Sequence, residues 1–492
     1  MKQRDYRETA FSRVLAATVV TLWVTPAVAQ VPNPTVAGPI AQNVQPGDPS
    51  HDYTFLTPAE DLSGAGYVEQ EFFIAGTANA YDTPAGQTGS VRSSGHPYRT
   101  RIVVRRPTSP RRFNGVVLLE WQNVTAGYDI DAHWGVSWPH FVQQGYAWVG
   151  VSAQRVGVHG ATVVPGTTPD PAAPPPVNNG LKAWSPIRYG SLDVMAGGTV
   201  TDDALCYDIF SQAAQAIRNP TGVRPLGRLR PQLVLAIGAS QSAGRLSTYH
   251  NAIHPLHGVV DAFYLLVGGA GLRTDLDVKV FQYLSETDLG RGPARRMADS
   301  DNFRSWEVAG TAHSSYYSDQ YRAPLVLRDF ATDPWPAECT LPPYSRVRGY
   351  YVINAQYDWL VRWVRAGSAP PSAPKLEFTA GEAPAIARDE RGFALGGIRL
   401  PEIEAPIALN AGANSGATFC TLYGTHQPFD AATLNELYPS HLSYVRAVLA
   451  SARRNQRAGY IPRDATREYT WDALLADVPP DAPPLDAGAD GP

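Results

Sequence analysis

The chain has 492 residues, of which 44% are hydrophobic and 17% charged, so it can form one large α/β domain with insertions or several ordinary domains. Lys and Arg total 41 and Asp and Glu total 45, which gives a formal net charge of −4. This balance lacks the basic excess of a nucleic-acid-binding protein, so we expect no nucleic-acid partner. Gly and Pro, at 43 each, stay below the ~25–30% that marks low-complexity chains.

The first 29 residues have the pattern of a secretory signal peptide. Four basic residues precede the apolar run 14–24, and Ala27-Val28-Ala29 fits the small-x-small cleavage pattern. Because that run is shorter than the ~20 residues that span a bilayer, we expect cleavage rather than anchoring. The mature chain would begin near Gln30, contain no membrane span, and lie in the periplasm or outside the cell.

The remaining chain divides into four predicted parts. Residues 30–50 form a flexible lead-in, and residues 51–330 form an α/β core. A Pro-rich insertion at about 157–200 interrupts the core, because proline lacks the N–H that helices and strands need; it is either a lid or an inert surface loop. Residues 331–476 form a C-terminal part packed on the core, and the acidic, Pro-rich stretch 477–492 is a disordered tail.

Apolar runs predict a mostly parallel central sheet flanked by helices. Several runs are nearly continuous in Val, Ile and Leu, as in strands covered on both faces. Strands are expected at 98–104, 116–121, 147–151, 233–237, 259–267, 278–284 and 303–308, and helices at about 133–144, 203–218, from 241 onward, 350–365 and 441–455. Alternation of strands and helices indicates an α/β fold.

The three cysteines suggest one disulfide and no metal site. Cys339 and Cys420 lie in Pro/Gly-rich surroundings, so they are the favoured pair in an oxidising compartment, whereas Cys206 lies in a helical pattern and is expected to be a buried free thiol. No CxxC motif or Cys/His cluster suggests a metal ligand set. We therefore expect neither a metal nor another cofactor.

The segment Gly238-Ala-Ser240-Gln-Ser242 has the layout of a nucleophile elbow, G-x-S-x-G, with Ser242 in place of the final glycine. A strand ends at the first glycine and a helix begins at once, so the turn is tight and its flanking residues must be small. The turn would expose the Ser240 hydroxyl above the start of a helix, where backbone N–H groups can hold an oxyanion. A competing register makes Ser242 the nucleophile.

The partners of a serine nucleophile follow in the chain order that α/β-hydrolases use, serine, acid, histidine. The predicted strand 278–284 leads into Glu286 and Asp288, and the predicted strand 303–308 leads into His313. His313 is the expected general base, and either Asp288 or Glu286 is the acid that orients it. Glu307 is a weaker third acid and His426 a rival base.

An oxyanion would be held by two backbone N–H groups. The first is that of Gln241, directly after the nucleophile. The second should come from the loop after the strand 116–121, within Gln122, Asn123 and Val124.

Several sequence blocks resemble a secreted alpha/beta hydrolase domain family whose elbow reads G-x-S-Q-S. The blocks are residues 115–123 with 145–154, 184–192, 238–245, 285–289 with 305–317, and 388–401. The resemblance implies an α/β-hydrolase fold and a Ser–His–acid triad without metal. It points to Ser240 as nucleophile and His313 as base, and it does not separate Glu286 from Asp288.

Together these features predict an exported serine hydrolase that acts on a small-molecule carboxylic ester. The same triad would also serve a lactonase, an amidase or an acyl transferase. A protein of another class, a binding protein that keeps the fold without catalysis, would be marked by a broken triad.

Overall fold

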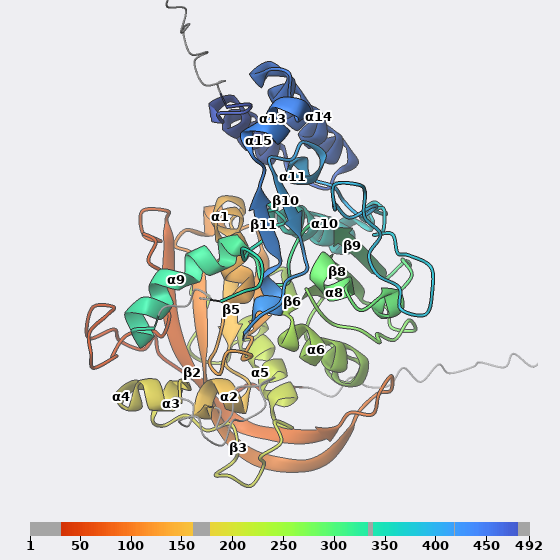
Figure 1. Cartoon of the computed structure of the whole chain (residues 1–492). Coiled ribbons are helices and arrows are strands. Elements are labelled where there is room, and N and C mark those ends of the chain that lie inside the picture. Colours follow the sequence, from red (N-terminus) through yellow and green to blue (C-terminus); the bar gives the residue numbers. More distant parts are fainter. Residues whose placement is uncertain (1–30, 161–177, 333–337, 418, 481–492) are drawn as a thin grey trace, which may run out of the picture.

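A twisted, mostly parallel sheet forms the centre of the molecule. The computed structural model describes residues 31–160, 178–332, 338–417 and 419–480, shown in Figure 1. Within them the main sheet has nine strands in the order β1-β2-β3-β5-β4-β6-β7-β8-β9. Strands β5, β4, β6, β7, β8 and β9 run parallel, and β1, β2 and β3 extend the sheet antiparallel on one side. The predicted fold class is confirmed.

The strand bounds follow the apolar runs closely. The strands are β1 (Thr35–Ala37), β2 (Tyr67–Asp82), β3 (Ser90–Pro107), β4 (Val116–Trp121), β5 (Ala147–Val151), β6 (Leu233–Ala239), β7 (Ala262–Leu266), β8 (Lys279–Ser285) and β9 (Phe303–Val308). Every residue of β4, β5 and β7 is buried, as expected for strands covered on both faces. Sequence analysis missed β2, because the polar run at Glu69–Glu71 conceals its strand pattern, and it found only the middle of β3.

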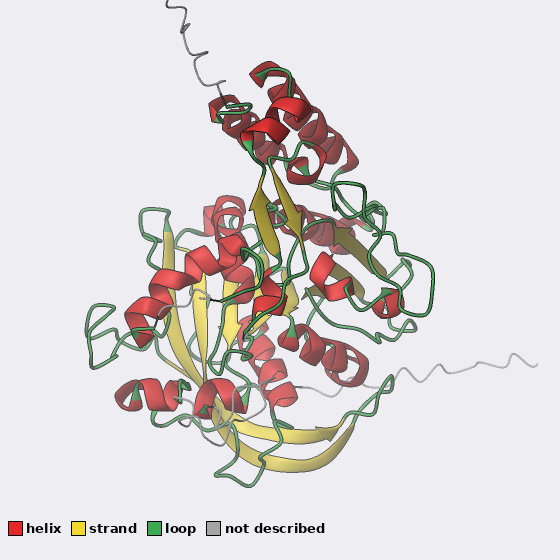
Figure 2. Ribbon diagram, viewed as in Figure 1, coloured by secondary structure: helices red, strands yellow, loops and turns green. Residues whose placement is uncertain are grey.

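Helices cover both faces of the sheet, as Figure 2 shows. On one face lie α1 (Ala132–Gln144) and α10 (Tyr350–Ala366), and on the other lie α5 (Cys206–Arg218) and α6 (Gln241–Thr248). Aromatic rings fill both interfaces: Tyr264 packs on Tyr357 of α10, and Trp121 stacks on Phe210 of α5. These helices lie where the sequence predicts them.

The described part of the insertion docks on the antiparallel strands. Residues 178–200 contain α3 (Leu181–Trp184) and α4 (Pro186–Tyr189). Buried Glu71 of β2 accepts hydrogen bonds from Arg101 of β3 and from Arg188 and Tyr189 of α4, at 2.6–2.7 Å. An ion network that is desolvated on all sides holds one geometry firmly, since removing one partner leaves a buried charge. Residues 161–177 of the insertion lie outside the described residues.

The C-terminal part adds helices and a small second sheet. It contains α11 (Pro401–Glu404), β10 (Ala408–Ala411), α12 (Cys420–Tyr423), β11 (Thr425–Pro428), α13 (Ala431–Leu437), α14 (His441–Ala458) and α15 (Arg463–Leu475). In Figure 1 the helices α11, α13, α14 and α15 stand together at one end of the molecule. A disulfide joins Cys339 to Cys420, and Cys206 is buried and free, which is the arrangement that the sequence favours.

Both predicted terminal segments are only partly described. The expected lead-in contains β1, which pairs with β2, so it is not flexible throughout. The expected tail begins with placed residues: Val478 is buried and its carbonyl contacts His441 Nδ1 at 2.9 Å. The predicted signal peptide and residues 481–492 lie outside the described residues. In the described part, helices long and apolar enough for a bilayer are not found.

Candidate active site

Ser240 occupies a strained turn between β6 and α6. Its backbone has φ 55° and ψ −116°, a region that L-residues avoid unless the surroundings impose it. A Cβ on Gly238 would come within 3.0 Å of the Ser242 backbone and 2.9 Å of the Leu246 side chain, and one on Gly268 within 2.7 Å of the Ser240 carbonyl oxygen. The two glycines therefore allow the close approach that the elbow requires; the motif predicts this for Gly238, whereas the role of Gly268 emerges only from the structure.

Ser242 closes this turn from below. Its side chain is fully buried, and its Oγ accepts a hydrogen bond from Ala239 N at 2.9 Å and donates to Ala239 O at 2.8 Å. A hydroxyl used in this way cannot reach a substrate. The geometry favours Ser240 over the competing register, and it explains how serine can replace the last glycine of the motif.

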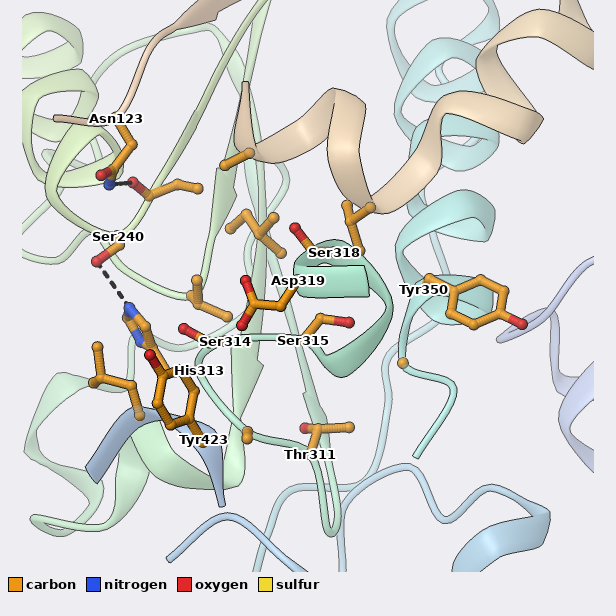
Figure 3. A pocket seen from close by; sticks show the side chains of 18 of the residues that line it. Asn123, Ser240, Thr311, His313, Ser314, Ser315, Ser318, Asp319, Tyr350 and Tyr423 are labelled. Carbon is orange, nitrogen blue, oxygen red and sulfur yellow. Dashed lines mark hydrogen bonds between the residues drawn. The ribbon is translucent and has the colours of Figure 1, made fainter. Parts of the chain in front are cut away.

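His313 bridges Ser240 and Asp288 (Figure 3 shows the contact with Ser240). His313 Nε2 lies 2.8 Å from Ser240 Oγ, and Nδ1 lies 2.6 Å from Asp288 Oδ1. The three groups come from the carboxyl ends of three parallel strands: Ser240 follows β6, Asp288 lies in α8 (Glu286–Leu289) after β8, and His313 lies in the loop after β9. One edge of the sheet therefore assembles a hydrogen-bonded chain from hydroxyl to carboxylate.

Asp288 is held in place as an anion. Its Oδ2 accepts hydrogen bonds from Ser285 N at 2.8 Å and from Ser285 Oγ at 2.6 Å. Burial alone would raise the pKa of this carboxyl, but attraction to His313 and the hydrogen bonds from His313 and Ser285 outweigh it, so the pKa lies below its usual value. A carboxylate in this state can stabilise an imidazolium next to it.

Glu286, the alternative acid, faces away from His313. Its Oε1 pairs with Arg388, and its Oε2 accepts a hydrogen bond from Gly310 N at 2.8 Å. Its own N–H donates to Thr311 O at 3.1 Å. Glu286 therefore fixes the loop that carries His313, and it joins that loop to the block 388–401.

The other candidate acid and base lie elsewhere. Glu307 forms a two-pronged ion pair with Arg296 at 2.6–2.7 Å. His426 lies in β11 with Nδ1 3.0 Å from Asn410 Oδ1, and burial lowers its pKa to about 4. Neither residue contacts Ser240 or His313.

The predicted oxyanion donors are only partly available. Gln241 is the first residue of α6, and its N–H has no partner among the described residues, as at any helix start. Of the predicted donors, Asn123 N donates to Ile130 O at 3.1 Å and Gln122 N donates to Val151 O at 3.5 Å, so neither N–H is free to hold an oxyanion in this structure. For Val124 N no hydrogen bond is found in the described part of the chain. Asn123 instead steadies the elbow, since its Nδ2 donates to Ala239 O at 2.9 Å.

A pocket of about 160 Å³ opens in front of Ser240 and His313. Sequence analysis missed most of its lining. One source is α9 (Tyr316–Phe330), whose internal Pro324 hides the helical pattern, and others are the segment 345–353 and the turn at α12. The residues 178–200 contribute nothing to the lining, so in the described part of the insertion no lid is found.

One histidine spacing also escaped the sequence analysis. His250 and His254 are four residues apart, which is a spacing that metal sites use. Both rings instead pack edge-on against Phe263. Among the described residues no group of three or more His, Cys, Asp or Glu side chains could hold a metal ion.

The sheet order, the strained serine turn and the Ser–His–Asp contacts are those of α/β hydrolases. Residues 36–470 match the model of the alpha/beta hydrolase domain family, and the chain belongs to that family. A comparison with curated proteins finds no match.

Two solved structures each match about half of the chain. Acetyl xylan esterase 1 from Thermoanaerobacterium sp. JW/SL YS485 is 12% identical, with 49% of this chain and 75% of that chain covered and a TM-score of 0.27. XC6422 from Xanthomonas campestris, described as an α/β serine hydrolase without lid, is 12% identical, with coverages of 53% and 95% and a TM-score of 0.26.

Proposed function

We propose that this protein is an exported serine hydrolase that cleaves carboxylic esters through an acyl-enzyme. The observation that carries the proposal is the continuous chain Ser240 Oγ–His313–Asp288, with contacts of 2.8 and 2.6 Å, on the wall of a pocket. Nucleophile, base and orienting acid within hydrogen-bond reach are the arrangement that activates a serine hydroxyl.

In this mechanism Ser240 Oγ attacks the acyl carbon while His313 Nε2 takes its proton. Asp288 fixes the imidazole with Nδ1–H donated to the carboxylate, and it stabilises the imidazolium that forms. The proton then passes from Nε2 to the leaving alcohol. Water, activated by the same nitrogen, attacks the acyl-enzyme and releases the acid and Ser240.

The negative oxygen of each tetrahedral intermediate needs hydrogen-bond donors. The Gln241 N–H at the start of α6 supplies one, helped by the positive end of the helix dipole. Of the three predicted partners in the loop after β4, Val124 offers the one N–H without a partner among the described residues. We assign the second donor to it.

The test is labelling by a fluorophosphonate, which reacts with an activated serine. The full-length mature protein should carry the label on the peptide that contains Ser240. Ser240→Ala and His313→Ala should remain unlabelled, whereas Ser242→Ala should keep the label, because Ser242 supports the turn without touching substrate. A label on Ser242 would overturn the mechanism, and so would the absence of any label on correctly folded wild-type protein.

Export rests on the pattern of residues 1–29, and the disulfide between Cys339 and Cys420 is compatible with it. Expression of the whole chain in a bacterial host should give a protein in the periplasm or medium whose N-terminus lies near Gln30. An intact N-terminus on protein retained in the cytoplasm would contradict export.

A further inference from the structure

The pocket has two chemically different walls. The side formed by α1, β7 and α10 is apolar, with Val136, Leu266 and Ile353 among its residues. The side formed by the loop after His313 and by α9 is polar, with Ser315, Ser318, Asp319 and Arg322. A purely hydrocarbon substrate would leave this polar wall without partners, which costs free energy once water is displaced.

On the polar wall, a carboxylate oxygen of Asp319 can accept a further hydrogen bond. Its side chain is 9% exposed and points from α9 into the pocket, as Figure 3 shows. Oδ1 pairs with Arg322, and the Tyr344 hydroxyl also hydrogen-bonds to this carboxyl, whereas no hydrogen bond to the buried Oδ2 itself is found in the described part of the chain. Burial raises the pKa of this carboxyl, an effect that Arg322 and the Tyr344 hydroxyl oppose. Buried acceptors in native proteins are normally satisfied, so Oδ2 calls for a donor from a ligand.

Arg322 supplies donors beside this acceptor. Its guanidinium lines the same pocket, and a hydrogen bond to Asp319 is the one found for it among the described residues. A guanidinium has five N–H donors. The pair therefore offers an acceptor and donors side by side, with opposite charges that cancel.

We propose that Asp319 and Arg322 bind hydroxyl groups of the substrate, so that the protein prefers esters of hydroxylated acids or alcohols. This inference rests on the proposed function. A hydroxyl donates its hydrogen to Asp319 Oδ2 and accepts from Arg322 with its oxygen. An ammonium or a carboxylate would be attracted by one member of the pair and repelled by the other, whereas a neutral hydroxyl can donate to Asp319 and accept from Arg322.

The test compares esters that differ only in hydroxyl groups. Propyl butyrate and 2,3-dihydroxypropyl butyrate differ in the alcohol, and ethyl butyrate and ethyl 3-hydroxybutyrate differ in the acid. Hydrolysis is followed by titration of the released acid. We expect kcat/KM to favour the hydroxylated member of at least one pair by about tenfold or more, because a site built for a hydroxyl discriminates against an analogue that lacks it. The responding pair tells which half of the ester meets Asp319.

The variants Asp319→Asn and Asp319→Ala separate recognition from support of the fold. We expect the preference for the hydroxylated ester to fall to near one in Asp319→Ala and to be reduced in Asp319→Asn, because these variants lower kcat/KM more for the hydroxylated ester than for the plain one. Gln320→Ala, at an exposed neighbouring position of α9, is the control and should keep the preference.

Two results would overturn the inference while leaving the proposed function intact. One is a wild type that hydrolyses all four esters without preference. The other is an equal loss on both members of a pair in the Asp319 variants, which would assign Asp319 a structural role. A protein that neither hydrolyses any ester nor takes the fluorophosphonate would overturn both, so the two failures are distinguishable.

Discussion

The two sides of the pocket arise in different ways. On the catalytic side, Ser240, Asp288 and His313 each follow a parallel strand by no more than five residues, and all three strands end at one edge of the sheet. The rest of the lining comes from α9, the start of α10 and the turn at Phe419–Tyr423, which converge from separate stretches of chain. The sheet itself thus positions the proposed reacting groups, whereas the shape and polarity of the pocket depend on segments packed around it.

This difference separates the chemistry from the selection of substrate. Changes at the strand ends should abolish the reaction whatever the substrate. Changes in the rest of the pocket lining should alter which substrate binds, while Ser240, His313 and Asp288 stay in place.

Asp288→Asn should lower kcat about 10⁴-fold, as the same change does in serine proteases, because His313 would be held in the wrong tautomer. Glu286→Gln is the matched variant, since Glu286 lies two residues away and contacts Arg388 and Gly310 rather than His313. Its kcat should fall by less than about a hundredfold. Kinetics on a p-nitrophenyl ester measure both, and equal losses would mean that the geometry assigns the acid wrongly.

Removal of the disulfide should affect substrate binding more than chemistry. Cys420 begins α12, and the adjoining Phe419, Leu422 and Tyr423 line the pocket. In Cys339→Ser/Cys420→Ser we expect a loss of about 2–5 kcal/mol in the free energy of unfolding and a raised KM, with kcat changed little. Cys206→Ala, which alters the buried free thiol, is the control. A fall in kcat with KM unchanged would contradict the separation.

The stability of the fold should also depend on pH through the ionisation of Asp288. Its pKa lies below the ordinary value of 3.8 in the folded protein, so its ionised form stabilises the fold above about that pH. This contribution is lost as the pH falls through the lowered value. Urea unfolding between pH 3 and 6 should therefore show wild type losing its advantage over Asp288→Asn toward the acid end. An advantage that grows on acidification would contradict the direction of the shift.

Local patterns pointed to the residues of the proposed triad. The elbow, the two strand-end acids and His313 each belong to a short motif with a steric or electrostatic requirement, and the structure brings Ser240, His313 and Asp288 into contact. The choice between Asp288 and Glu286 could not be made in this way. Both follow the same strand, and the direction of each side chain depends on partners far away in sequence, Ser285 and His313 for one and Arg388 for the other.

The same local patterns did not predict the rest of the pocket lining. Helix α9 contains Pro324, which reads as a helix breaker, and α12 is a four-residue turn with no periodicity. The loop after β4 was placed correctly, but the hydrogen bond from Asn123 N to Ile130 depends on a bridge to the segment before α1. A bridge of this kind cannot be predicted from the sequence of either of the two segments that form it.

The α/β class, the apolar runs of the central strands, the elbow motif and the candidate disulfide can be predicted from the sequence, because they follow from local periodicity, steric limits and residue chemistry. The folded chain is needed to show which acid contacts His313, which N–H groups lack partners, and that Asp319 and Arg322 line the pocket. Those choices depend on long-range packing, in which each polar group takes the partner that the folded chain brings within hydrogen-bond distance.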